Sequence, residues 1–197
     1  MKGGPRALFY VGRSPVVLAS GSPRRVALLR QAKLPFTVVD PGPDRVWPGR
    51  AEPRNGVRAL ALDKARRVAA EHPEAVVIAA DTVVVVRGVR MGKPDTVEQA
   101  GEMLRRLQGR THEVWTGLAV VRRGEARTAA VCTRVQFTRM TEEEIGVYAA
   151  TREPLDKAGA YGIQGLGAMF VRRIEGDYFN VVGLPLHRLR QLLAEFA

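Results

Sequence analysis

Apolar positions along the chain follow two different periods, which predict alternating strands and helices. Continuous apolar runs predict strands at residues 15–20, 36–40, 75–86, 112–121, 127–138 and 168–175. Apolar residues spaced three and four apart predict helices that begin near Pro23, Asn55, Thr96 and Pro185. This order predicts an α/β protein with a mixed sheet, in which residues 122–125 turn a hairpin between the two longest strands.

Polar residues at the predicted helix ends support these boundaries. Thr96 with Gln99, and Thr141 with Glu144, have the spacing of a capping box. Ser22 is placed as the N-cap of the first helix, before Pro23 as its first residue. Residues 41–54, which are rich in proline and glycine, predict a long loop.

The charge balance narrows the range of partners. The 197 residues carry 31 Lys and Arg against 20 Asp and Glu, a net charge of +11, which favours nucleic acid, a membrane surface or a phosphate-bearing small molecule. A single cysteine, Cys132, excludes an internal disulfide, and no apolar run reaches the length of a membrane helix. These features predict a cytoplasmic protein.

The first candidate site is the segment from Ser20 to Arg25 (SGSPRR), where a strand runs into a helix start. Backbone N–H groups and the positive end of the helix dipole favour anions there, and Ser20, Ser22, Arg24 and Arg25 add hydroxyls and guanidinium groups. The pattern predicts a phosphate-binding turn. An ordinary capped surface helix with solvated arginines is the alternative.

The second candidate is Asp81, inside the apolar run AVVIAADTVVVV. A carboxylate buried among valines costs several kcal/mol unless it is paired, hydrogen-bonded or bound to a metal. Asp81 is therefore a candidate catalytic base or metal ligand, and a structural hydrogen bond is the alternative. If the strand is regular, Thr82 points to its opposite face.

Lysines are informative because the chain has only five beside 26 arginines. Lys64 falls on the apolar stripe of its predicted helix, Lys93 lies in the turn MGKP, and Lys157 opens the glycine-rich segment KAGAYGIQG. Ammonium groups neutralise phosphate oxygens, so all three are candidate phosphate ligands, with snorkelling or surface lysines as the alternative. In the same segment Gln164 offers a donor and an acceptor for a base edge.

Seven segments, taken together, match those of one family in order. They are LASGSPRR (18–25), LALDKA (60–65), AADTVV (79–84), GKP (92–94), MLRRLQGRTHEVWTGLAVV (103–121), EPLDKAGAYGIQG (153–165) and VVGLPL (181–186). The chain thereby resembles the Maf family of nucleoside triphosphate pyrophosphatases. The resemblance covers residues 14–197, which we expect to form a single domain, and residues 1–13 are predicted to be an N-terminal extension.

The resemblance implies an elongated mixed sheet flanked by helices, with two lobes around a nucleotide cleft (Maf/ITPase-like), and a homodimer. It implies hydrolysis of a nucleoside triphosphate to the monophosphate and pyrophosphate with Mg²⁺ or Mn²⁺, in a house-cleaning role that extends to modified pyrimidine triphosphates. Asp81 takes the position of the proton acceptor. Arg24, Thr82 and Gln164 match the positions that mark substrate choice, and their combination resembles the branch that hydrolyses dTTP and UTP.

The sequence does not determine the metal ligands or the substrate. Relatives usually have two consecutive acids where this chain has Asp44 and Arg45, so the metal ligands are undetermined, with Asp81 and Asp44 as candidates. A 7-methyl-GTP or other purine triphosphate is the alternative substrate, and a non-enzymatic role in septum formation or nucleic-acid binding is the alternative function. The absence of a recognisable nucleic-acid-binding motif disfavours the latter.

Overall fold

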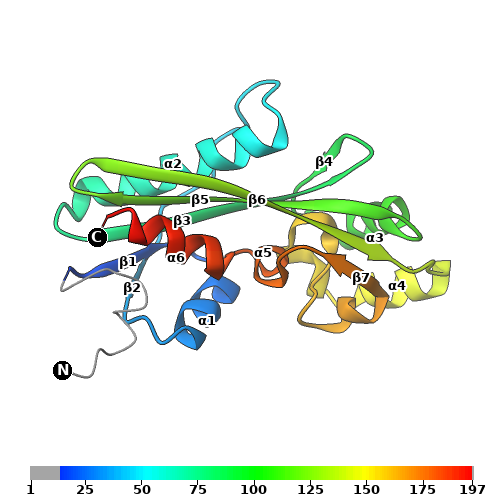
Figure 1. The fold of residues 1–197 in the computed structure, drawn as a ribbon. Coiled ribbons are helices and arrows are strands. Elements are labelled where there is room, and N and C mark those ends of the chain that lie inside the picture. The colour runs from blue at the N-terminus through cyan, green and yellow to red at the C-terminus, as the bar shows by residue number, and fades with distance from the viewer. Residues whose placement is uncertain (1–13, 197) are drawn as a thin grey trace. The chain divides into compact units, whose positions relative to one another are not determined.

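The computed structural model describes residues 14–196 and confirms the α/β class with a mixed sheet (Figure 1). The predicted extension of residues 1–13 lies outside the described residues. Two compact units arise from discontinuous stretches of the chain. Unit 1 comprises residues up to Asp81, Thr116–Val131 and the residues from Gly183, and unit 2 comprises Thr82–Trp115 and Cys132–Val182. A single domain enclosing a nucleotide cleft stays a prediction.

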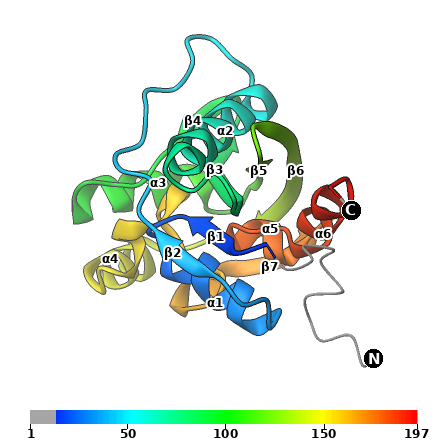
Figure 2. The same ribbon diagram turned by 90° about the vertical axis from the view of Figure 1, so that its left-hand side faces the viewer.

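Unit 1 contains three parallel strands and parts of two longer strands. It contains β1 (Val16–Ala19), α1 (Pro23–Gln31), β2 (Thr37–Val39), α2 (Pro53–Glu71) and α6 (Leu186–Ala194), with parts of β3 (Val76–Val86), β5 (Thr111–Arg122) and β6 (Glu125–Phe137). β1 pairs in parallel with β2 and with β3. Helix α2 covers one face of these strands, and α1 and α6 cover the other (Figure 1, Figure 2).

Unit 2 joins the remaining parts of β3, β5 and β6 to short strands and helices. These are β4 (Val89–Met91), α3 (Val97–Leu107), α4 (Glu142–Ala150), β7 (Val171–Glu175) and α5 (Tyr178–Val182), with the 3₁₀ turns η2 (Glu153–Asp156), η3 (Ala158–Ala160) and η4 (Leu166–Phe170). β4 pairs antiparallel with β3, and β7 pairs antiparallel with β6.

Local sequence signals account for most element boundaries. Thr141 and Glu144 form a complete capping box at the start of α4, and Thr96 accepts a hydrogen bond from the backbone of Gln99. Most strand ends differ from the prediction by one or two residues, and three differences are larger or concern a whole element. Helix α2 begins at Pro53 with Glu52 as N-cap, earlier than Asn55, because proline is accommodated at the first helical position.

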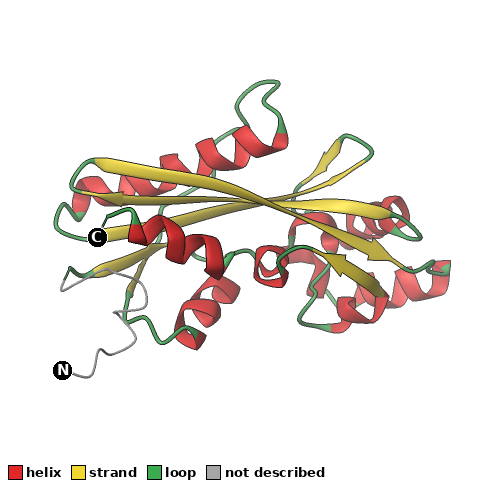
Figure 3. Ribbon diagram, in the orientation of Figure 1, coloured by secondary structure: helices red, strands yellow, loops and turns green. Residues whose placement is uncertain are grey.

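The other two differences lie near the C-terminus. Residues 168–170 belong to the 3₁₀ turn η4, so the strand predicted at 168–175 is limited to β7 (Figure 3). Helix α5 is not predicted by apolar spacing. Its first N–H groups are satisfied by the Asp177 carboxylate, which accepts hydrogen bonds from Phe179 and Asn180.

Within residues 14–196, no helix combines the length and the apolar character needed to cross a membrane.

The core of unit 2 contains one buried histidine. His112 is 1% exposed, and its Nε2 lies 2.8 Å from the hydroxyl of Tyr161. Its ring packs edge-on against Tyr161 and Phe137. Burial disfavours the charged imidazolium and lowers the pKa of His112 from 6.5 to about 4.

We expect His112 to make the protein less stable in acid. Because the unfolded chain binds the proton near pH 6.5 and the folded chain only near pH 4, the unfolding free energy falls between these values, by about 3 kcal/mol. Denaturant unfolding from pH 7 to pH 4 measures the effect. His112→Gln should lose this part of the pH dependence, whereas His187→Gln, which removes an exposed imidazole, should keep it. Equal slopes for all three proteins would contradict the prediction.

Candidate active site

Asp81 lies at the one partly exposed point of an otherwise buried strand. In β3 every residue except Asp81 and Thr82 is buried. The strand pairs with β1 over Val76–Ala79 and with β4 over Val84–Val86, so the two polar residues fall between the two pairings. The Asp81 side chain is 13% exposed. A carboxylate at this position can reach a ligand while the strand around it stays fixed.

Lys64 of α2 is the partner of Asp81. Its Nζ donates to Asp81 Oδ1 at 2.6 Å and lies 2.6 Å from Asp44 Oδ1 in the loop before α2. The Lys64 side chain is only 7% exposed, as its place on the apolar stripe predicted, whereas that of Asp44 is 60% exposed. A buried ammonium requires such acceptors, because an unpaired charge in this position would be strongly destabilising. Lys64 thus joins the two candidate metal-binding carboxylates.

The turn between β1 and α1 brings Ser20 and Arg25 together. The buried Ser20 hydroxyl accepts hydrogen bonds from the Ser22 backbone and from Arg25 Nη1, both at 3.2 Å. Arg25 Nε donates to the carbonyl oxygen of Gly183 at 2.8 Å. Burial lowers the pKa of Arg25, and the negative charge of Asp81 opposes that shift. Arg25 therefore belongs to the same charged cluster as Asp81.

Ser22 occupies the predicted N-cap position of α1 but does not cap the helix with its side chain. Its backbone is extended (φ −77°, ψ 116°), and its hydroxyl makes no capping hydrogen bond. Arg24 follows on the first turn of α1 and is partly exposed. Ser22 is therefore the N-cap residue, as predicted, although its hydroxyl does not bond to the helix.

The loop between β2 and α2, which carries Asp44, is held along α2. Arg67 donates to the carbonyl oxygens of Pro41 and Pro43. Arg45, which stands where relatives usually have an acid, forms an ion pair at 3.0 Å with Asp63 of α2. These contacts keep Asp44 beside Lys64 at the site.

A second anchor on the same loop depends on a glycine. Trp47 lies over Gly56, where an added Cβ would come within 1.9 Å of the indole ring, and its Nε1 donates to the carbonyl of Ala51. Any side chain at position 56 would displace the tryptophan. The sequence alone does not predict this contact, because a glycine inside a helical pattern gives no indication of the side chain that packs on it.

The other predicted residues belong to unit 2. Lys93 is exposed in its turn, and the carbonyl of Gly92 before it accepts a hydrogen bond from Gly159 at 2.9 Å. The lysine turn therefore lies directly against the glycine-rich segment. Thr82 is partly exposed on β3, and Gln164 is exposed between η3 and η4.

The Lys157 ammonium group bonds to residues of its own turn. Its Nζ donates to the carbonyl of Glu153 at 2.7 Å and to the carboxylate of Asp156 at 2.6 Å. Its role as a phosphate ligand stays a prediction. The same region contains two residues for which the sequence predicts no role, Tyr148 and Glu153, and their hydrogen bonds fix the segment that follows.

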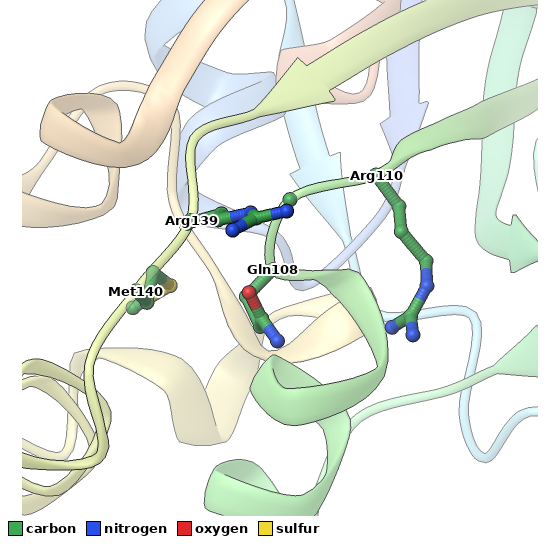
Figure 4. Close-up of a pocket in the computed structure, with 5 residues that line it drawn as sticks. Gln108, Arg110, Arg139 and Met140 are labelled. Carbon is green, nitrogen blue, oxygen red and sulfur yellow. The ribbon is translucent and has the colours of Figure 1, made fainter.

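Unit 2 also has a pocket at the end of α3, with a volume of about 440 Å³ (Figure 4). It is lined by Gln108, Gly109, Arg110, Arg139 and Met140. None of these is a predicted site residue. Arg110 Nη1 donates to the carbonyls of Arg105 and Arg106 and so closes the end of α3.

The fold and the charged cluster define an α/β protein in which a strand-to-helix turn, a buried lysine and a strand carboxylate together suit a phosphate-bearing ligand. The family model described as "Maf-like protein" matches residues 15–196, and the chain belongs to this family. The resemblance based on the seven segments is thereby confirmed.

Curated relatives are similar over nearly their whole length. A dTTP/UTP pyrophosphatase of Moorella thermoacetica is 52% identical over 185 residues, covering 93% of this chain and 95% of the relative. The protein with the same name from Bacillus cytotoxicus is 50% identical over 180 residues, covering 91% and 94%. That from Symbiobacterium thermophilum is 50% identical over 181 residues, covering 92% and 93%.

Proposed function

We propose that this protein hydrolyses dTTP and UTP to the nucleoside monophosphate and pyrophosphate, as a house-cleaning enzyme of the cytoplasm. The observation that carries the proposal is Asp81, a partly exposed carboxylate held at 2.6 Å by the buried Lys64 in a chain of this family. Relatives named dTTP/UTP pyrophosphatase, about half identical over more than nine-tenths of the chain, support the substrate.

The reaction needs a base and several cationic groups. Asp81 accepts a proton from water, whose oxygen attacks the α-phosphorus. The bond from that phosphorus to the bridging oxygen breaks, and pyrophosphate leaves with the electron pair. Arg25, Ser20 and Lys64 lie in the same cluster and can stabilise the charge that develops on the phosphate oxygens. Ser22, Arg24, Lys93 and Lys157 are proposed as further phosphate or nucleotide ligands.

The residues present fit a divalent cation. Asp44 and Asp81 both bind one ammonium group, which shows that a positive charge at this place satisfies both carboxylates. Within residues 14–196 no cluster of three or more His, Cys, Asp or Glu side chains could bind a metal. Two carboxylates are nevertheless the protein ligands that Mg²⁺ typically takes when substrate phosphates and water complete its shell. Asp44 and Asp81 would hold Mg²⁺ or Mn²⁺, which would stabilise charge on the triphosphate.

Arg24, Thr82 and Gln164 are proposed to select the base. Their support is the resemblance to the dTTP/UTP branch and the names of the relatives. A homodimer, which the family resemblance implies, stays a prediction.

The direct test is a substrate panel. We expect pyrophosphate release from dTTP and UTP, with kcat/KM at least about tenfold above that for dCTP, GTP and 7-methyl-GTP, as one or more hydrogen bonds to the base would provide. Release should depend on added Mg²⁺ or Mn²⁺ and stop with a chelator. A preference for 7-methyl-GTP would refute the substrate. No release from any nucleotide, together with salt-dependent DNA binding, would support the non-enzymatic alternative.

A further inference from the structure

The Glu153 carboxylate holds the backbone of residues 162–167, the segment that contains Gln164. Glu153 Oε2 accepts a hydrogen bond from the Leu166 N–H at 2.9 Å, and its Oε1 accepts one from the Gly167 N–H at 3.2 Å. The Tyr148 hydroxyl donates to the same Oε1 at 2.9 Å. These donors fix the carboxylate in one orientation and tie the far end of the segment to it.

Tyr148 fixes the N-terminal end of the same segment. Its hydroxyl oxygen accepts a hydrogen bond from the Gly162 N–H at 3.1 Å while its proton is donated to Glu153. Gln164 therefore lies two residues from an anchor on each side. Its own side chain is exposed, so its direction depends on the backbone between the two anchors.

Two glycines show how closely the segment wraps these side chains. A Cβ added at Gly165 would lie 2.4 Å from Glu153 Oε2, and one added at Gly167 would lie 2.5 Å from the Tyr148 hydroxyl. At these two positions the backbone of the segment therefore lies directly against Glu153 and Tyr148. The two glycines and the side chains of Glu153 and Tyr148 therefore pack together.

The electrostatics keep the carboxylate charged. Partial burial raises the pKa of Glu153, but hydrogen bonds from the Leu166 N–H, the Tyr148 hydroxyl and the Gly167 N–H, together with the positive charge of Lys157, outweigh burial, so that the pKa falls below its ordinary value. Burial also raises the pKa of Tyr148, which therefore keeps its proton to donate. The arrangement holds throughout the neutral pH range.

We infer that Glu153 and Tyr148 are positioning residues for nucleobase selection, because they hold the backbone that aims the Gln164 amide. The inference rests on the proposed function and adds residues that act through Gln164 without touching the substrate. An amide has a donor and an acceptor side, so it discriminates between bases only when its orientation is fixed.

The test compares Glu153→Gln, Tyr148→Phe, Gln164→Ala and the double variant Glu153→Gln/Gln164→Ala, with Glu102→Gln as the control for loss of an exposed carboxylate in the same unit. The measured quantities are kcat/KM for dTTP, UTP, dCTP and GTP. The inhibition constant of inorganic tripolyphosphate, which has no base, reports on phosphate binding alone. Thermal unfolding verifies that each variant is folded.

We expect the dTTP-over-GTP ratio of kcat/KM to fall about tenfold in Glu153→Gln, the loss of about one hydrogen bond to the base, and by a smaller factor in Tyr148→Phe. The tripolyphosphate inhibition constant should stay within about twofold of wild type, because no phosphate ligand is changed. The double variant should lose no more discrimination than Gln164→Ala, since the two residues act in series.

Three results would overturn the inference. One is unchanged base discrimination in both folded single variants, and another is an additive loss in the double variant. The third is a parallel loss of tripolyphosphate inhibition, which would make Glu153 a support for phosphate binding. Failure of the proposed function is separate, because wild type would then release no pyrophosphate from dTTP or UTP.

Discussion

Asp81→Asn should lower kcat/KM for dTTP by about 10²- to 10⁴-fold, the range expected when a general base is removed. The amide has nearly the same size and can still accept a hydrogen bond from Lys64, but it cannot take a proton from water. Asp44 remains as a charged partner for Lys64, 2.6 Å from its Nζ, so the variant should fold. Pyrophosphate release measured beside the thermal unfolding curve separates lost chemistry from lost structure.

The matched control for Asp81→Asn is Glu74→Gln. Glu74 is an acid of unit 1 whose exposed side chain pairs with Arg123 at 3.2 Å, and a surface pair of this kind contributes little to stability. It should keep wild-type activity. Wild-type turnover in folded Asp81→Asn would mean that the proton acceptor is another group.

Gly117→Ala should lower the unfolding free energy by about 3 kcal/mol. An added Cβ would lie 2.1 Å from the carbonyl oxygen of Val57 and 2.7 Å from the backbone nitrogen of Arg58, both in α2. Because these are backbone atoms, the whole helix must move. Helix α2 carries Lys64, so activity should fall as well. Chemical denaturation measures the change in unfolding free energy.

Gly146→Ala is the control for Gly117→Ala, because position 146 has room for a methyl group. Gly146 lies in α4, and an added Cβ there would meet no atom within 4 Å. Alanine is the better helix former, so this variant should gain about 1 kcal/mol of stability. Equal effects at positions 117 and 146 would show that the close approach of α2 to β5 does not limit stability.

Signals confined to a few neighbouring residues predicted much of the structure. The capping box at Thr141 and the apolar run of β3 depend on short-range spacing, and both were confirmed. The place of Lys64 on the apolar stripe of its helix predicts that its side chain is not a solvated base, and the side chain is buried. The sequence also placed an acid inside β3, but it could not say that Asp44, far along the chain, would share the same ammonium.

Signals that depend on distant partners were missed. Glu153 lay within a matching segment, yet its role depends on N–H groups 13 and 14 residues further on. Arg67 holds carbonyls of residues 41 and 43, 26 and 24 residues before it. In both cases a charged residue forms hydrogen bonds with the backbone of a distant loop. Composition and periodicity do not predict where that loop runs.

The division of β3 between the two units sets a limit on insertions and deletions. The boundary falls between Asp81 and Thr82, with the β1 pairing on one side and the β4 pairing on the other. Since successive side chains of a strand point to opposite faces, one residue gained or lost between Ala79 and Val84 would turn over every side chain beyond it. An inserted or deleted residue in this part of β3 should therefore destabilise the protein, whereas the loops can accommodate a change in length.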